Sequence, residues 1–344
     1  MGVAGNGARS VSRRFAWLDP FIVLLLLTLG AAAVLPPRGD VGSLLAAASG
    51  VAVAVQFFIS GLRLSTSAVV QGLKAWQLHL VIGAASFVFF PLMGLGVAAG
   101  SSWYLTHELV AGLLFLTMLP TAVQTAIAFT GIGRGNTAAA VCAASISNLL
   151  GIVVTPLLVA LALGSYSGMN PASAVKIVLQ IVLPFVLGQL LNRRLGGWAA
   201  RRALPLKIVD RGAVLLVVYA AFGAAVANGL WQKLPPAQLA VTAGICAFML
   251  AVALTATSLA ARAMGFSRAD ATAIMFCGSE KSLATGLPLS AILFHGPLAG
   301  VVILPVIMYH AMQLVVCAAI ARRVARKHAP DPGTSAVRKP AEVP

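Results

Sequence analysis

Residues 276–288 read Phe276-Cys277-Gly278-Ser279-Glu280-Lys281-Ser282-Leu283-Ala284-Thr285-Gly286-Leu287-Pro288. This segment places an acid beside a base in the middle of an apolar stretch, 267–293, and about 20 such residues suffice to cross a bilayer. A charge at the bilayer centre costs at least about 2.5–3.5 kcal/mol, so an ionisable residue in a membrane span usually belongs to a site. We therefore favour a binding role for Glu280 and Lys281 over a purely structural one.

The adjacency of the two charged residues also bears on the local backbone conformation. Adjacent residues do not face each other on an intact helix, so Glu280 and Lys281 can pair directly only where the backbone unwinds. Otherwise each needs a separate partner. Gly278 weakens helix continuity just before the pair, which favours unwinding. Ser279 and Ser282 flank the pair and are candidate site residues with it.

A second segment with polar residues at its middle lies at the corresponding place in the first half of the chain. It reads Leu119-Pro120-Thr121-Ala122-Val123-Gln124-Thr125-Ala126-Ile127-Ala128. Pro120 removes a backbone donor, and Gln124 and Thr125 align with Glu280 and Lys281 without a gap. Unwound backbone at membrane depth must be buried in protein or line a cavity, so two meeting breaks would supply carbonyls and helix ends for a cation and an anionic substrate. The alternative for each segment is a kinked but continuous helix.

The composition excludes a soluble enzyme. Of the 344 residues, 60% are hydrophobic and 9% are charged, whereas soluble domains carry about 25% charged residues. The 24 Lys and Arg residues outnumber the 8 Asp and Glu residues, but they lie in short segments between apolar runs, which indicates membrane orientation and not nucleic-acid binding. Within one all-α domain, 18–326, we predict ten membrane spans at 18–36, 41–62, 73–99, 106–131, 137–163, 172–192, 208–230, 237–262, 267–293 and 298–321.

The basic residues predict the topology of these spans. Twenty Lys and Arg residues fall on one side and three on the other, which places both termini in the cytoplasm of a multi-pass protein of the plasma (inner) membrane. The longest expected loop, 193–207, separates two five-helix repeats, about 18–164 and 165–326. An odd number of helices in each repeat inverts the second relative to the first. Residues 1–17 form a cytoplasmic tail, and a second tail, 327–344, is predicted to be disordered.

Other polar residues lie within the predicted spans. Ser145 and Asn148 share a helical face at i and i+3 and are candidate site residues, with packing or a bond to their own backbone as the alternative. His310 is a lone His in the tenth span, and its expected role is structural, with a proton path as the alternative. Asp19 and Asp210 each open a span and are predicted to cap helix N-termini.

The sequence offers little support for other chemistry. No Ser/His/Asp set, paired carboxylate or His/Cys metal spacing is present, so we expect neither an enzyme nor a cofactor. The cysteines have no CxxC spacing and are expected to be small buried hydrophobes. They are Cys142, Cys246, Cys277 and Cys317. The sequence leaves the oligomeric state open.

In several stretches of its sequence the chain resembles the bile acid:sodium symporter superfamily, specifically its branch of sodium/bile acid cotransporter 7-like proteins. The resemblance runs from Asp19-Pro20 through the tenth span. It is densest in Phe129-Thr130-Gly131-Ile132-Gly133-Arg134-Gly135-Asn136, in Ser145-Ile146-Ser147-Asn148-Leu149-Leu150-Gly151 with Thr155-Pro156, and in residues 278–288. The resemblance implies a core domain of spans 3–5 and 8–10, with broken spans four and nine crossing, that moves against a panel of spans 1–2 and 6–7.

The resemblance also implies where sodium ions bind, and the chain matches that pattern only in part. In the family, polar residues of span four contribute, and these positions fall on Gln124 and Thr125. Ser86 stands in the position of a span-three Gln, so it is a secondary candidate together with His310. The two span-five hydroxyls fall on Ala140 and Ala144.

Span nine departs from the sodium pattern in its charged residues. The family's Glu position is Phe276, its Gln position is Glu280 and the Asn that follows is Lys281. A Lys can replace a bound sodium ion electrostatically, and a Glu–Lys pair can carry a proton. The expected coupling ion is therefore sodium or a proton, or there is none.

These observations predict a secondary active transporter that moves a small organic anion by alternating access. Its expected site residues are Gln124, Thr125, Ser145, Asn148, Ser279, Glu280, Lys281 and Ser282. The alternative is a membrane regulator of ion homeostasis, for example of calcium, that uses the same fold without moving a solute. The resemblance supports this alternative because the branch includes members with no established substrate and is linked to calcium handling.

Overall fold

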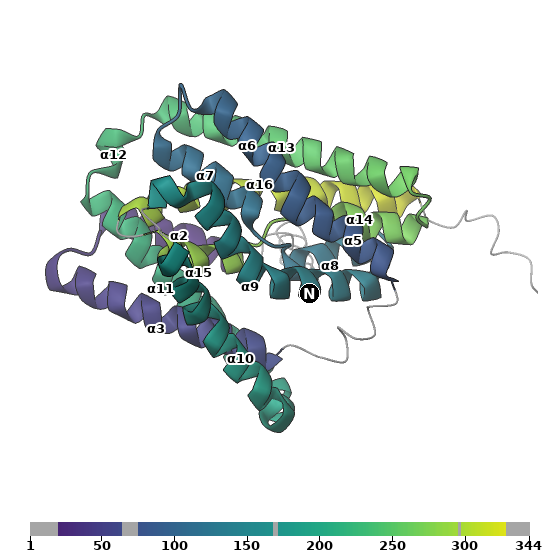
Figure 1. Cartoon of the computed structure of the whole chain (residues 1–344), viewed down its shortest axis with the longest axis horizontal. Coiled ribbons are helices and arrows are strands. Elements are labelled where there is room, and N and C mark those ends of the chain that lie inside the picture. Colours follow the sequence, from purple (N-terminus) through teal and green to yellow (C-terminus); the bar gives the residue numbers. More distant parts are fainter. Residues whose placement is uncertain (1–19, 64–74, 168–170, 295–296, 328–344) are drawn as a thin grey trace, which may run out of the picture.

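The computed structural model describes residues 20–63, 75–167, 171–294 and 297–327, and all regular structure in these ranges is helical (Figure 1). Each predicted span coincides with one helix or with consecutive helices. They are α2 (Pro20–Val34), α3 (Gly39–Arg63), α5 (Trp76–Ala84) with η2 (Ala85–Phe89) and α6 (Phe90–Ser101), α7 (His107–Met118) with α8 (Val123–Ile132), α9 (Thr137–Ser167), α10 (Pro171–Arg201), α11 (Ala203–Ala227), α13 (Pro236–Ala263), α14 (Arg268–Ser279) with α15 (Leu283–Leu293), and α16 (Pro297–Lys327). A short helix, α12 (Leu230–Lys233), precedes α13.

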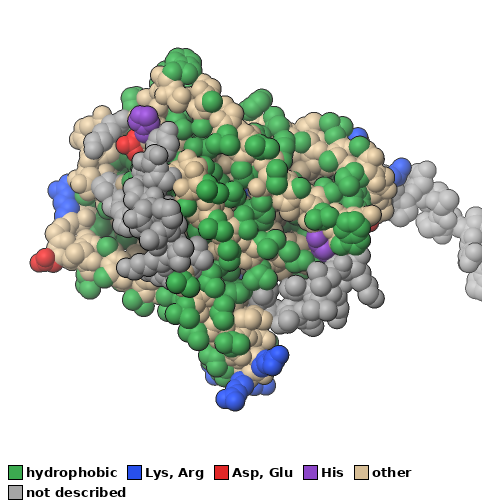
Figure 2. Space-filling model, in the orientation of Figure 1, with side chains coloured by type: hydrophobic (Ala, Val, Ile, Leu, Met, Phe, Trp, Pro, Cys, Tyr) green, Lys and Arg blue, Asp and Glu red, His purple; other side chains and the backbone are tan. Residues whose placement is uncertain are grey.

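Length and apolar character mark several of these helices as membrane spans. Among the described residues, six helices are long and apolar enough to cross a bilayer, and α7 with α8 makes a seventh if a bent pair counts as one span. Figure 2 shows hydrophobic side chains spread across the visible face, with Lys and Arg gathered at its edges. The expected tail 1–17, Asp19 and residues 328–344 lie outside the described residues.

The expected long loop at 193–207 is wrong. Helix α10 continues to Arg201 and α11 begins at Ala203, so only Arg202 stands between the two helices. The segment is rich in Arg, Leu and Ala, which are good helix formers even where a chain leaves the apolar layer. The boundary between the two halves of the chain is therefore a helical junction.

The helices pack in two groups. In the first group, α3 packs against α10 and α11, and α11 packs against α2. In the second group, α16 packs against α7, α8, α13 and α15, and α14 packs against α5, α8, α9 and α13. Helix α11 also contacts α16 and joins the two groups. Figure 1 shows α3, α10 and α11 at the lower left, away from α5, α6, α13 and α14 at the upper right. Two glycines allow α3 and α10 to cross closely, because a Cβ on Gly61 would meet the carbonyl oxygen of Phe185, and one on Gly188 would meet that of Phe58. Small residues permit this close approach of membrane helices.

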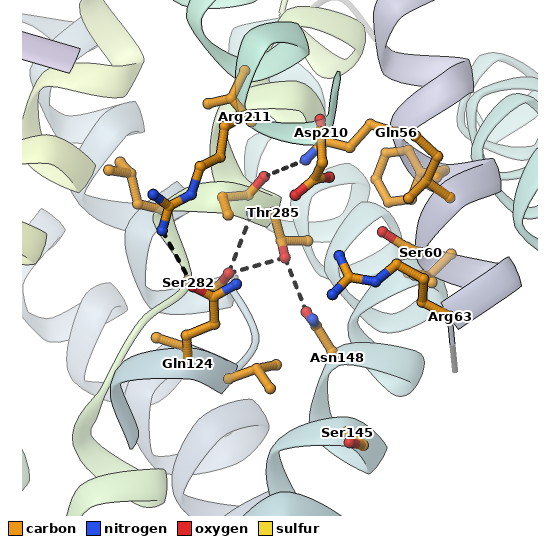
Figure 3. Close-up of a pocket in the computed structure, with 18 of the residues that line it drawn as sticks. Gln56, Ser60, Arg63, Gln124, Ser145, Asn148, Asp210, Arg211, Ser282 and Thr285 are labelled. Carbon is orange, nitrogen blue, oxygen red and sulfur yellow. Dashed lines mark hydrogen bonds between the residues drawn. The ribbon is translucent and has the colours of Figure 1, made fainter. Parts of the chain in front are cut away.

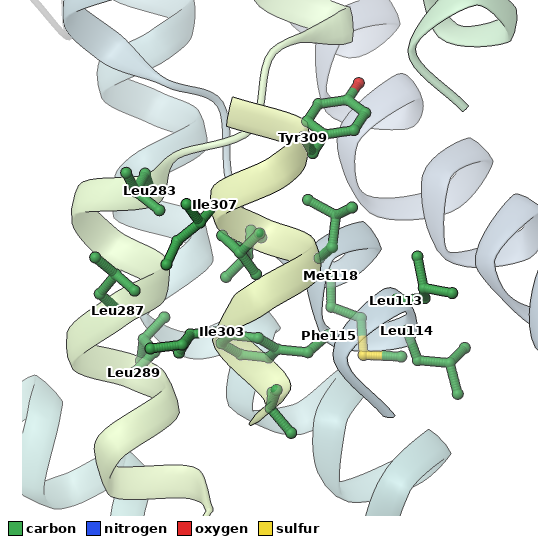
Figure 4. Packing of buried hydrophobic residues seen from close by; sticks show 14 of the residues in the cluster. Leu113, Leu114, Phe115, Met118, Leu283, Leu287, Leu289, Ile303, Ile307 and Tyr309 are labelled. Carbon is green, nitrogen blue, oxygen red and sulfur yellow. The ribbon is translucent and has the colours of Figure 1, made fainter. Parts of the chain in front are cut away.

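Helix α16 fills the centre of the second group and supports both interrupted helices. Figure 4 shows Ile303 and Ile307 of α16 between α7 and α15. Phe115 of α7 stacks edge-to-face on Phe294, with ring centroids 5.3 Å apart. Truncating a well-packed core side chain such as Phe115 typically costs about 3–5 kcal/mol. This packing holds the two helix interruptions in place.

Candidate functional site

Both predicted helix interruptions are present in the structure. Helix α7 ends at Met118 and α8 begins at Val123, with a bend of 59° between them. Helix α14 ends at Ser279 and α15 begins at Leu283, so Glu280 and Lys281 lie outside both helices, and the backbone of Glu280 is extended. We call residues 117–122 break four and residues 277–282 break nine, each range including the last residues of the preceding helix, whose carbonyls the interruption leaves available. The alternative of kinked but continuous helices is wrong for both segments.

The two breaks bind each other directly. The Thr121 hydroxyl of break four donates to the Cys277 carbonyl at 2.8 Å, and the Ser282 N–H of break nine donates to the Pro120 carbonyl at 2.9 Å. Gly151 of α9 lies against Pro120, where a Cβ would come within 2.7 Å of the ring. The breaks therefore cross at a position where their polar groups form hydrogen bonds with each other and not with water.

Lys281 extends from break nine into break four. Its side chain is 1% exposed, and its ammonium donates to the carbonyl oxygens of Leu119 at 2.8 Å, Ser86 at 3.0 Å and Thr117 at 3.1 Å. The ammonium also lies 4.0 Å from the centroid of the Phe90 ring. Since an ammonium has three donors, all of them are used.

Glu280 has a different set of neighbours. It is fully buried, and one carboxylate oxygen accepts a hydrogen bond from the Thr125 hydroxyl. The other oxygen, Oε1, has no hydrogen-bond partner in the described part of the chain. The backbone unwinds at the pair, yet Glu280 and Lys281 each have separate partners. Thr125 stands between Glu280 and the cavity described below.

The main chain of break nine is held by α16. The Lys281 N–H donates to Gln313 Oε1 at 2.9 Å, and Gln313 Nε2 donates to the Lys281 carbonyl at 3.1 Å. The Tyr309 hydroxyl donates to the Ser279 carbonyl at 2.7 Å, and His310 Nδ1 lies 3.4 Å from the Lys281 carbonyl. These side chains hold the position from which Lys281 reaches break four.

Side chains also satisfy the carbonyls and amides that break four exposes. The Thr155 hydroxyl donates to the Met118 carbonyl at 2.7 Å, and the Thr121 N–H donates to Ser147 Oγ at 3.0 Å. The Ser86 hydroxyl lies 3.1 Å from that of Thr121. The sequence predicts free carbonyls in this break, and this expectation is wrong for these residues because the protein's own donors occupy them.

A cavity of about 380 Å³ lies beside the crossing. Residues from α2, α3 and α11 line one side of it, and residues from α8, α9, α15 and α16 line the other. Figure 3 shows the guanidinium groups of Arg63 and Arg211 pointing into this space, together with Gln124, Asn148 and Thr285. Two guanidiniums and one carboxylate, Asp210, give the lining a net positive charge, which favours an anion.

Hydrogen bonds join polar residues from several elements across this lining. Arg211 Nη2 donates to Gln124 Oε1 at 3.5 Å. The Thr285 hydroxyl donates to Asn148 Oδ1 and accepts from Ser282 Oγ, each at 2.9 Å. These interactions connect α11 to α8 and α9 to α15. They are therefore contacts that a bound solute could replace.

The structure separates the candidate residues into two sets. The first set lines the cavity and comprises Gln124, Thr125, Ser145, Asn148, Ser282 and His310. The second set is buried behind the cavity wall and comprises Ser86, Ser279, Glu280 and Lys281. Within the second set, the Ser279 hydroxyl bonds the carbonyl of Met275 in its own helix at 2.7 Å. That of Ser145 bonds the Val141 carbonyl in the same way.

Several residues of the site are not among the sequence candidates. Arg63 and Arg211 carry a sequence signal, but it was assigned to membrane orientation. Asp210 was predicted to cap a helix, and this is wrong because α11 begins at Ala203, well before Asp210. Gln313 could have been noticed as an amide in an apolar span. Asp270, by contrast, lies in the first turn of α14, where its N–H donates to Ser267 Oγ at 3.1 Å.

Among the described residues, no group of three or more His, Cys, Asp or Glu side chains lies together. The four cysteines are buried, as expected.

Comparison with known proteins identifies relatives along almost the whole chain. Residues 19–326 match the model of the SBF-like CPA transporter family. An uncharacterized protein of Pseudomonas aeruginosa is 44% identical over 311 residues, which cover 90% of this chain and 93% of that protein. The YfeH protein of Escherichia coli, named as a symporter, is 40% identical over 91% of this chain and 95% of its own length. Sodium/bile acid cotransporter 7 of Rattus norvegicus is 32% identical, with 86% of this chain and 89% of that protein covered.

Proposed function

Because the chain belongs to the SBF-like CPA transporter family, we propose that it is a secondary active transporter that moves a small organic anion across the plasma (inner) membrane. This family is one of transporters and not of enzymes. The proposed site is the cavity at the crossing of breaks four and nine. Relatives named as a symporter and as a sodium/bile acid cotransporter support this proposal.

The observation that carries the proposal is the position of the cavity between the two helix groups. Its volume of about 380 Å³ lies within the range of roughly 300–1,000 Å³ found for small-molecule sites. Arg63 and Arg211 come from the group of α2, α3, α10 and α11, whereas Gln124, Asn148 and Thr285 come from the other group. An anion bound here would contact both groups, so movement of one against the other would change its access.

The proposed mechanism uses ten spans in two inverted five-helix repeats, with both termini in the cytoplasm. Arg63 ends α3 and Arg211 lies in the first part of α11, which places the cavity toward the side richer in Lys and Arg. That side is cytoplasmic under the positive-inside rule. The conformation described here is therefore assigned as inward-facing. Rocking of the four-helix group would close this side and open the other.

We assign ion coupling to Glu280. A buried carboxylate with one unpartnered oxygen must gain a proton, a cation or another partner, because an isolated buried charge is too costly to persist. Thr125 connects this carboxylate to the cavity. A proton is the favoured ion, since the lysine ammonium already holds the nearby carbonyls of break four.

Transport by purified protein in proteoliposomes tests the proposal. Taurocholate, succinate and pyruvate would be offered under an imposed proton gradient, a sodium gradient or neither. We expect proton-driven movement of at least one anion, reduced at least tenfold by Arg211→Ala and unchanged by Arg262→Ala, an exposed control outside the cavity. Absence of any solute movement under all three conditions would contradict the transporter and favour the regulator.

A further inference from the structure

The ammonium of Lys281 lies in an environment built like a cation site. Its three acceptors are main-chain carbonyl oxygens at 2.8–3.1 Å, and they come from Ser86, Thr117 and Leu119. The face of the Phe90 ring covers it at 4.0 Å. Rings of carbonyls that replace a hydration shell select monovalent cations in channels, and an aromatic face attracts a cation further.

Local helix geometry explains why these carbonyls are available. Thr117 lies in the last turn of α7 and Leu119 follows that helix, so their carbonyls lie at the negative end of a helix dipole. Ser86 lies in η2, a π-helical turn between α5 and α6. Single π-helical turns inside α-helices frequently mark functional sites. Two separate irregularities thus direct oxygens to one point.

The neighbouring carboxylate, that of Glu280, does not explain this arrangement. Glu280 is adjacent in sequence, but its carboxylate accepts from Thr125, and the ammonium's three donors all go to carbonyls. A buried lysine is ordinarily stabilised by a partner of opposite charge or reaches toward water. Here the partial negative charges on backbone oxygens stabilise the ammonium, as they would stabilise a free cation.

We propose that Lys281 is a tethered cation that fills a monovalent-cation site formed by the carbonyls of Ser86, Thr117 and Leu119 and the ring of Phe90. When the side chain is shortened, the site accepts a free ion of ammonium type. Distances of 2.8–3.1 Å to oxygen suit methylammonium, ammonium and K⁺ better than the smaller Na⁺. The consequence for transport rests on the proposed function, whereas the existence of the site does not.

Thermal unfolding of the full-length protein in detergent tests the site without any transport. Wild type, Lys281→Ala and Lys281→Met would be compared in N-methylglucamine, Na⁺, K⁺, ammonium and methylammonium chlorides at equal ionic strength. We expect Lys281→Ala to gain about 3 °C or more in Tm from methylammonium or ammonium, less from K⁺ and least from Na⁺. Wild type and Lys281→Met should not change, because a side chain still fills the site.

The two variants separate a cation site from simple packing. Equal responses of Lys281→Ala and Lys281→Met, or none in either, would mean that the lysine serves only to satisfy carbonyls, and would overturn the proposal. Lys207→Ala, at a half-exposed position of α11, controls for general effects of removing a lysine and should behave as wild type.

Wild type provides a measurement that does not require either variant to fold. With the site filled, its Tm should be the same in Na⁺ and in N-methylglucamine, and a sodium-specific rise of several degrees would contradict a filled site. In proteoliposomes, sodium-independent anion transport agrees with the tethered cation. If wild type moves no anion while Lys281→Ala still responds to cations, the proposed function is rejected and this inference stands.

Discussion

Break four carries no charged residue and offers main-chain acceptors, whereas break nine carries both ionisable residues and supplies the donor that those acceptors bind. The carbonyls of break nine are bound in turn by Tyr309 and Gln313 of α16. Two segments at matching places in the chain have therefore become complementary in chemistry. Two helix interruptions at matching positions in the two halves of a sequence therefore need not form two equivalent ion sites.

The largest effect that would test this comparison is expected at Gln313. Gln313→Leu leaves both the N–H and the carbonyl of Lys281 without their bonds, and each unsatisfied buried group costs about 1–3 kcal/mol. We therefore expect a loss of about 2–6 kcal/mol in the free energy of unfolding, measured by denaturation in detergent. Gln77→Leu, at an exposed position of α5, is the control. A loss below about 0.5 kcal/mol would show that α16 does not hold break nine.

A matched pair of smaller changes compares the two breaks directly. Thr155→Val removes one hydroxyl donor from the Met118 carbonyl, and Tyr309→Phe removes one from the Ser279 carbonyl. Each leaves one buried acceptor unsatisfied, so each should cost about 1–3 kcal/mol. Denaturation curves measured side by side give the difference. If only Tyr309→Phe destabilises, break four does not depend on its donor as break nine does.

The smallest effect on stability is expected at Gln124, where substitution should nevertheless greatly reduce transport. This side chain is exposed to the cavity and has a long hydrogen bond of 3.5 Å to Arg211. Gln124→Ala strands no buried partner, so the free energy of unfolding should change by less than about 0.5 kcal/mol. Transport should nevertheless fall at least tenfold. Unfolding or loss from the membrane would instead assign Gln124 a packing role.

The sequence predicted the helix stretches and the sites of both breaks because each has a local cause. Pro120 cannot donate within a helix, and the Glu280-Lys281 pair is costly in an apolar helix. The loop at 193–207 was wrongly predicted because charge density marks the end of a membrane span and not the end of a helix. Helix α10 continues past that point to Arg201.

The partners of the breaks could not be predicted in the same way. Thr155, Ser147 and Tyr309 are ordinary residues of separate spans, and only tertiary packing directs their hydroxyls to particular carbonyls. Arg63 and Arg211 carried a signal that membrane orientation already explained. Charge counting cannot distinguish an arginine that anchors a loop from one that faces a cavity.

The contacts of Lys281 also have a consequence for biosynthesis. Every acceptor of its ammonium, and the Phe90 ring, precedes it in the chain. When a ribosome delivers the segment that contains Lys281, the segments that hold these groups have already been made. A charge that would cost about 2.5–3.5 kcal/mol to insert alone then enters beside acceptors already in place. A circular permutant that begins with α14 would reverse this order, and its membrane insertion should fail more often although the finished contacts are the same.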